Sequence, residues 1–174
     1  MDINKEEDTK TSKNIGFASG LQSLSDALIA LVEQASPSVV SLASVIPDAG
    51  RRRWGRFGLG TGVVLSEDEG HIISNSHVVH RAQEAEVGLP SGETARAKVV
   101  GRDAESDLAL LKLESKVGSL KSIQFGDSDQ LKVGQFVIAV ARAFGADPSA
   151  TSGIITSSRR SIRGGVASSL RMSS

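Results

Sequence analysis

The stretch GTGVVLSEDEGHIIS at residues 60–74 decides the fold. It contains two short runs that are rich in β-branched residues, 60–65 and 71–74, and the turn signal Glu69-Gly70 lies between them. Two such runs on either side of a turn predict neighbouring antiparallel strands.

Four further runs of the same character extend outward from this stretch. They cover residues 39–44, 86–89, 94–101 and 108–113. No helical pattern interrupts the series, so a doubly wound sheet with crossover helices is not indicated. Six short strands separated by turns predict one small closed antiparallel barrel, and the predicted fold class is all-β.

The sequence before the barrel has a different pattern. Residues 1–19 are polar and lack an apolar period, which predicts a disordered N-terminal arm. From Leu21 onward Leu24, Leu28 and Leu31 recur at helical spacing, and Pro37 disfavours helix in the residue before it. The sequence therefore predicts a helix over residues 20–35, which we expect to cover a sheet.

The sequence after the barrel contains fewer strands. Residues 36–122 are predicted to hold the first barrel and a connector, and residues 135–141 and 151–157 read as two more strands. Two strands cannot close a second barrel and would leave their edges unpaired, so residues 123–157 are predicted to form a partial second barrel. Residues 158–174 lose the apolar period and are predicted to be an unstructured tail.

Composition excludes several classes of function. Lys plus Arg and Asp plus Glu both number 20 among 174 residues, and aromatic residues make up 3% of the chain. A neutral chain with few aromatic residues argues against nucleic-acid binding, and the arginines at residues 51–53 are read as a solvated loop. With no cysteine, the chain has no disulfide, thiolate metal site or cysteine nucleophile.

The sequence also contains no segment apolar enough to span a bilayer. Its first eight residues are polar and acidic, unlike an export signal, which predicts a cytoplasmic location by default.

Three histidines, His71, His77 and His80, are the first candidates for chemistry. No carboxylate partner completes a metal-binding set around them, so neither a metal nor a cofactor is predicted. The glycine-rich residues 58–62 (GLGTG) lie within a strand pattern and precede no helix, so they are not read as a phosphate-binding loop.

His77 follows one predicted strand and Asp107 opens another. A buried aspartate at a strand end can accept the Nδ1 proton of a neighbouring histidine, which leaves Nε2 free to act as a base. By spacing alone, a histidine and an aspartate so far apart in a sequence are more often a coincidence than a catalytic pair.

Several motifs occur together and in order, at residues 36–40 (SPSVV), 60–64 (GTGVV), 70–79 (GHIISNSHVV), 106–113 (SDLALLKL), 126–140 (GDSDQLKVGQFVIAV) and 151–155 (TSGII). With these motifs the stretch from about Ser36 to Arg163 resembles the protease domain of the HtrA (Deg) family of trypsin-like serine proteases, and we expect residues 20–174 to form that domain. The resemblance implies a chymotrypsin/trypsin-like double β-barrel, here with the first barrel complete, the second truncated and a helix at the N-terminus.

The resemblance also implies a function. Members of this family are serine endopeptidases that hydrolyse peptide bonds of unfolded or damaged proteins, usually in the periplasm, and they commonly form homo-oligomers. It implies that His77 is the general base and Asp107 its orienting carboxylate, with polypeptides as substrates and no cofactor.

Two departures from the family pattern bear on activity. Ala141-Arg142-Ala143 replaces the family's Gly-Asn-Pro, and the nucleophile motif Gly-Asn-Ser-Gly-Gly does not occur in residues 1–174. Ser128, Ser168 and Ser169 lack the flanking glycines that an oxyanion turn needs. We therefore expect the chain to be inactive alone; the alternatives are a non-catalytic protein-binding module or one half of a split enzyme.

Overall fold

The structure is a computed structural model that describes residues 4–46, 55–118, 120–142 and 147–157. Its elements, in chain order, are α1 (Asn4–Ala35), the 3-10 helix η1 (Ser36–Ser38), β1 (Val39–Ile46), β2 (Gly55–Ser66), β3 (His71–Asn75), β4 (Glu84–Gly88), β5 (Thr94–Asp103), β6 (Leu108–Leu113), the 3-10 helix η2 (Ser128–Gln130), β7 (Phe136–Ala141) and β8 (Ser149–Ile154). By its internal contacts the chain divides into two compact units, residues 1–124 with 138–151, and residues 125–137 with 152–174.

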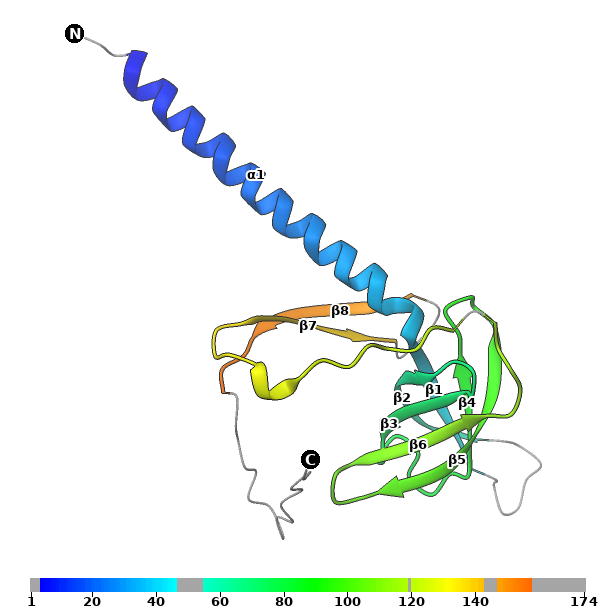
Figure 1. Ribbon diagram of the computed structural model, residues 1–174. Coiled ribbons are helices and arrows are strands. Elements are labelled where there is room, and N and C mark those ends of the chain that lie inside the picture. Colours follow the sequence, from blue (N-terminus) through cyan, green and yellow to red (C-terminus); the bar gives the residue numbers. More distant parts are fainter. Residues whose placement is uncertain (1–3, 47–54, 119, 143–146, 158–174) are drawn as a thin grey trace. The chain divides into compact units, whose positions relative to one another are not determined.

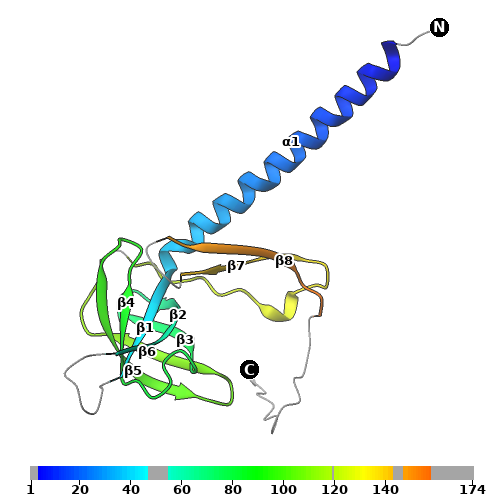
Figure 2. The ribbon, with the colours of Figure 1, turned by 180° about the vertical axis from the view of Figure 1, so that it is seen from behind.

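The first six strands form the predicted closed barrel, in the order β1-β2-β3-β6-β5-β4. Every pair is antiparallel, and β1 closes the barrel by pairing with both β2 and β4, where Ser41 faces Thr61 on one side and Gly88 on the other. Figures 1 and 2 show these strands from opposite sides. β2 begins earlier than the predicted strand at residues 60–65, because its pairing with β1 continues as far as Gly55, which lies opposite Ile46.

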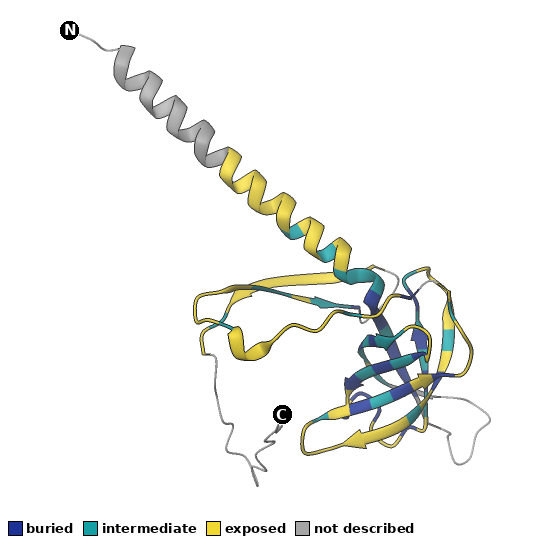
Figure 3. Ribbon diagram, in the orientation of Figure 1, coloured by how far each residue is buried: buried dark blue, intermediate teal, exposed yellow. Residues whose placement is uncertain are grey.

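The core lies inside this barrel. Along β4, buried residues alternate with half-buried ones. This period of two is expected for a strand that has one face toward the core. The largest fully buried side chains come from several strands of the barrel and the turn after β3, and include Val40, Leu42, Val64, Ile72, Val79, Val87 and Leu111. Figure 3 shows this concentration of buried residues on the barrel.

The helix α1 differs from its prediction in length and in packing. It begins at Asn4, so residues 4–19, which the sequence predicts as a disordered arm, are helical. No proline stands before Pro37, so nothing in the sequence forces an earlier end. The expectation that the helix covers a sheet is wrong, because Leu21, Leu24 and Leu31 keep about half of their surface exposed. No helix among the described residues is both long and apolar enough to cross a membrane.

β7 and β8 form a separate two-stranded sheet. β8 runs from Ser149 to Ile154, slightly earlier than predicted, and every one of its residues is exposed. Apolar side chains on and before these strands are also exposed, among them Phe125, Val133, Phe136 and Ile154. The described residues thus comprise one closed barrel, one open sheet and one N-terminal helix, as the fold class predicts.

Candidate active site

The barrel brings the ends of β3 and β6 together. β3 pairs antiparallel with β6, and the last residue of β3, Asn75, faces the first residue of β6, Leu108. The residues immediately beyond this pair, Ser76 and His77 after β3 and Asp107 before β6, therefore lie next to one another at the barrel rim. Two residues that are thirty positions apart in the sequence become neighbours through this single strand pairing.

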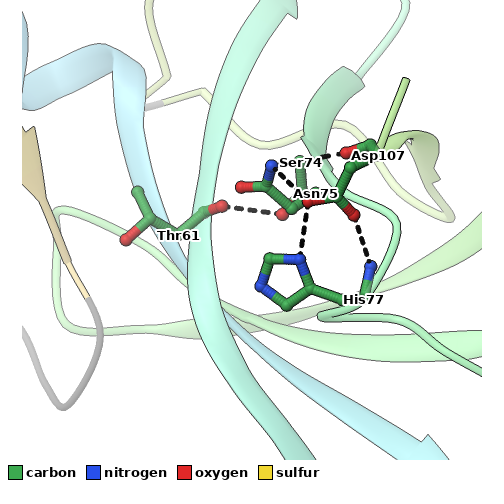
Figure 4. Close-up of polar contacts among 5 residues, drawn as sticks. All are labelled: Thr61, Ser74, Asn75, His77 and Asp107. Atoms are coloured by element: carbon green, nitrogen blue, oxygen red, sulfur yellow. Dashed lines mark hydrogen bonds and ion pairs between the residues drawn. The ribbon is translucent and has the colours of Figure 1, made fainter. Parts of the chain in front are cut away.

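His77 and Asp107 are joined by two hydrogen bonds (Figure 4). The imidazole Nδ1 of His77 lies 2.7 Å from Oδ2 of Asp107, and the backbone N–H of His77 donates to Oδ1 at 3.0 Å. With its proton on Nδ1, the ring donates to the carboxylate and keeps Nε2 as a proton acceptor. The carboxylate thus contacts both the backbone and the ring of His77, which fixes where the imidazole stands.

Asn75 and Ser76 hold Asp107 in its place. The Asn75 side-chain amide donates to Oδ2 of Asp107 at 3.1 Å and to its backbone oxygen at 3.3 Å. The backbone N–H of Ser76 donates to the same backbone oxygen at 3.0 Å. Asp107 has a φ of 55°, in the left-handed region that aspartate tolerates better than most residues. These contacts stabilise the uncommon backbone conformation that aims its carboxylate at His77.

The turn before Asp107 has its own bonds. Oδ2 of Asp103 accepts a hydrogen bond from the Ser106 hydroxyl at 2.6 Å, and Oδ1 accepts one from the Glu105 backbone N–H at 2.9 Å. An aspartate that bonds to the chain two and three residues ahead is a common way to build a tight turn. The β5–β6 connection is therefore shaped locally, and Asp107 stands at its end.

The electrostatics of the pair favour a charged carboxylate. The pKa of Asp107 is lowered first by the hydrogen bond from the His77 backbone N–H and then by the bond from the His77 ring, while desolvation opposes both. The charge of the imidazole and the Asn75 amide lower the pKa of Asp107 further. An ionised carboxylate is the form that can stabilise a protonated imidazole.

One detail of the prediction is wrong, because Asp107 is not buried. Its side chain is 43% exposed and that of His77 is 70% exposed. The reason is their position, since both residues stand beyond the last paired residues of β3 and β6 and thus at the rim of the barrel. The imidazole of His77 is therefore exposed, so an incoming group can reach the ring while Asp107 holds it in place.

Gly58 and Gly60 make room for the turn that carries His77. A Cβ atom on Gly58 would lie 2.1 Å from the backbone oxygen of Val78, and one on Gly60 would lie 2.6 Å from the Val78 side chain. Both distances are too short for a real contact, so β2 can pass beside this turn only with glycine at these positions. Sequence reasoning missed this role, although alternate glycines in a strand do signal a face without side chains.

Arg142, where the sequence departs from the family pattern, is buried against the barrel. Its Nε donates to the backbone oxygen of Val39 at 3.1 Å, and its backbone N–H donates to the Thr61 hydroxyl at 3.0 Å. The backbone oxygen of Thr61 in turn accepts from the Ser74 hydroxyl at 2.7 Å. Arg142 is 3% exposed, and its Nη1 has no hydrogen-bond partner among the described residues. The hydrogen bonds of Arg142 thus connect the segment after β7 to β1 and β2.

The other predicted candidates have different surroundings or lie outside the described residues. His71 bonds to Glu69 through Nδ1 and Oε2 at 2.8 Å, and His80 is exposed in the turn after His77. Ser128 begins the 3-10 helix η2, which Asp127 caps by accepting a bond from the backbone of Asp129. Ser168 and Ser169, and the arginines at residues 51–53, lie outside the described residues.

Comparison with known proteins identifies the family. Residues 60–173 match the model of the trypsin-like peptidase domain. A probable periplasmic serine protease do/HhoA-like of Haemophilus influenzae is 42% identical over 104 residues, which cover 60% of this chain and 22% of that protein. The periplasmic pH-dependent serine endoprotease DegQ of Escherichia coli is 40% identical over 104 residues, with 60% and 23% covered.

A longer alignment joins the chain to a probable periplasmic serine endoprotease DegP-like of Ectopseudomonas mendocina. It has 34% identity over 168 residues and covers 76% of this chain and 35% of that protein. The chain thus spans between about a fifth and a third of the length of these relatives. Together with the closed barrel and the ordered motifs, these matches show that the chain belongs to the trypsin-like peptidase family and is similar to its HtrA (Deg) serine proteases.

Proposed function

We propose that this chain carries the general base and the orienting carboxylate of an HtrA-type serine endopeptidase, in which His77 is the base and Asp107 the carboxylate. The observation that supports the proposal is the double contact of Asp107 with His77, at 2.7 Å to Nδ1 and 3.0 Å from the backbone N–H. A histidine held in this way by a carboxylate is the base of serine proteases on several folds.

In the proposed mechanism Nε2 of His77 accepts the proton of a serine hydroxyl as that oxygen attacks the carbonyl carbon of the scissile peptide bond. The imidazolium that forms is stabilised by the ionised Asp107, and it then gives the proton to the leaving amine. The same Nδ1 bond serves both steps, because it keeps the ring from turning while Nε2 takes up and releases the proton. The hydrolysed bonds are those of unfolded or damaged polypeptides.

The serine itself is proposed to come from outside residues 1–174, since the motif Gly-Asn-Ser-Gly-Gly is not in this sequence. A base without an adjacent nucleophile and an oxyanion hole cannot form an acyl-enzyme. The chain alone is therefore proposed to be inactive. The relatives are named periplasmic proteases, which supports an extracytoplasmic location for the complete enzyme.

A non-catalytic protein-binding module is the second candidate function. It is favoured by the β7–β8 sheet, whose exposed side chains include Phe136 and Ile154. An extended peptide can add to the edge of such a sheet through backbone hydrogen bonds. This role needs neither His77 nor Asp107.

An activity-based probe distinguishes the two functions. Residues 1–174 alone should neither cleave casein nor react with a fluorophosphonate, which labels only an activated serine. Joined to the remaining protease-domain segment of the Escherichia coli relative, the chain should become reactive. In that enzyme His77→Ala should reduce cleavage by several orders of magnitude while the thermal unfolding profile is preserved.

Two results would contradict the proposal. Near-normal cleavage by the His77→Ala enzyme would remove this residue from the mechanism. Labelling of residues 1–174 alone would show that the chain contains its own nucleophile, and Ser128, Ser168 and Ser169 would then be replaced first. A joined protein that folds, binds unfolded casein and never reacts would instead support the binding module.

A further inference from the structure

The carboxylate of Asp107 has a hydrogen-bond donor that the proposed mechanism does not use. Its Oδ1 accepts from the backbone N–H of His77, and its Oδ2 bonds to the ring Nδ1 of the same residue. Oδ2 also accepts from the side-chain amide of Asn75 at 3.1 Å (Figure 4). Within the part of the chain that the structure describes, Asn75 is thus the one residue other than His77 that donates to this carboxylate.

A single nitrogen of Asn75 bonds to Asp107 at two points. Its Nδ2 donates to Oδ2 at 3.1 Å and to the backbone oxygen of Asp107 at 3.3 Å. An amide NH₂ group has two protons, so it can serve both acceptors at once. An ionised carboxylate and a carbonyl only accept, so the amide must turn its nitrogen and not its oxygen toward Asp107. This bridge from backbone to carboxylate restrains the rotation of the Asp107 side chain.

Asp107 needs such a restraint because of its position. Its side chain is 43% exposed, and an ion pair between exposed side chains gives little stability by itself. Its φ of 55° lies in a region that non-glycine residues keep only where the surrounding structure holds them. Without the amide, the carboxylate would be free to turn toward water and away from the imidazole of His77.

The side chain of Asn75 is not part of the core. Asn75 is the last residue of β3, where its backbone pairs with Leu108, and it is exposed. Its neighbour Ser74 is different, because Ser74 is buried and its hydroxyl donates to the backbone oxygen of Thr61 at 2.7 Å. Truncating an exposed side chain leaves no cavity, so the contact of Asn75 with Asp107 can be removed without damage to packing.

We propose that Asn75 is a positioning residue, which holds the Asp107 carboxylate toward Nδ1 of His77 and thereby keeps the ring in the tautomer that leaves Nε2 free. The carboxylate can only accept, so the ring nitrogen that faces it must carry the proton. When the carboxylate turns away, the proton is free to move to Nε2, and the ring loses its readiness as a base. The inference rests on the proposed function, because Asn75 acts only through Asp107 and His77.

Nitrogen NMR of the histidine rings in the full chain tests this role without any peptidase activity. The chain has three histidines, and His77→Ala identifies the signals of that ring. At a pH about two units above the ordinary histidine pKa of about 6.5, the wild-type ring should carry its proton on Nδ1. In Asn75→Ala the fraction protonated on Nε2 should rise several-fold. Asn75→Leu keeps the size of the side chain without its donor and should behave in the same way.

The matched control is Ser74→Ala, which removes one side-chain hydrogen bond from the same strand without touching Asp107. Its ring signals should match those of the wild type. The Asp107 carboxyl group, followed by carbon NMR, provides a second readout. Its pKa is lowered chiefly by the His77 backbone N–H and in part by the Asn75 amide, so it should rise in Asn75→Ala and stay unchanged in the control.

Two outcomes would overturn the inference, and they can be told apart. If both Asn75 variants keep the ring proton on Nδ1 as the control does, Asn75 has no positioning role, and the proposed function of His77 and Asp107 still stands. If the wild-type ring carries its proton on Nε2, the bond from Nδ1 to Asp107 does not form in solution. That second result would contradict both the inference and the proposed function.

Discussion

The barrel and the β7–β8 sheet are both built from antiparallel strands but are buried very differently. β4 alternates between buried and half-buried residues, whereas all residues of β8 are exposed, although the sequence reads as strand in both. The barrel closes, so each of its strands has a paired neighbour on both sides. Within the part of the chain that the structure describes, the β7–β8 sheet has one ladder and no further strand paired at either edge. The core lies inside the closed barrel, and among the described residues its buried cluster includes none from β7 or β8.

The largest expected effect comes from truncating one isoleucine in each region. Ile72 in β3 is fully buried, so Ile72→Ala should lower the free energy of unfolding by about 2–5 kcal/mol, because it removes apolar contacts and leaves a cavity. Ile154→Ala in β8, where the side chain is largely exposed, should change it by less than about 0.5 kcal/mol. Urea unfolding followed by circular dichroism measures both. Equal losses would mean that the sheet has a core of its own in solution.

A methyl group added to a glycine should have a smaller effect on stability than the isoleucine truncation. It should again destabilise the barrel and leave the β7–β8 sheet nearly unchanged. Gly58→Ala puts a Cβ against the Val78 backbone oxygen and should destabilise the barrel by about 1–3 kcal/mol while it displaces the turn that carries His77. Gly153→Ala in β8 meets no atom within 4 Å and should be nearly neutral. The amide chemical shifts of the 76–79 turn should move in the first variant only. An undisturbed turn in Gly58→Ala would show that β2 and this turn are less closely packed.

The smallest expected effect concerns the rim of the barrel and depends on pH. Because the pKa of Asp107 is lowered in the folded protein, its carboxylate contributes stability above the unfolded pKa, about 3.9. That contribution is lost as the pH falls through the lower, folded pKa. The difference in thermal midpoint between wild type and Asp107→Asn should therefore be present at pH 7 and shrink below about pH 4. A difference that does not change between pH 7 and pH 3 would contradict this assignment.

Much of the fold could be predicted from local patterns. The period of two and the turns between runs placed all six barrel strands, since each pattern reflects one inward face and a local change of direction. The length of α1 could not be predicted in this way, because residues 4–19 lack the apolar period and only the absence of a helix-breaking proline allows them to continue the helix.

Only part of the candidate site could be predicted from local sequence patterns. His77 and Asp107 could be named from motifs, but spacing alone did not distinguish a pair from a coincidence. Their contact depends on β3 and β6 being neighbours, a choice that the order of strands along the chain does not reveal. The role of Gly58 and Gly60 in admitting the turn at Val78 could not be predicted from the sequence. A glycine in a strand indicates that some other group approaches closely, but the sequence does not identify that group.

The sequence by itself determined which segments become strands, which face of each strand is apolar, and that no cysteine or metal-ligand motif is available for chemistry. These properties depend on residues close together in the chain. The tertiary structure alone decided that β1 closes the barrel against β4, that the Asp107 carboxylate meets both the ring and the backbone of His77, and that Arg142 is buried against Val39. Each of these joins residues far apart in the sequence, and their contact follows from the pairing of whole strands and not from any local preference.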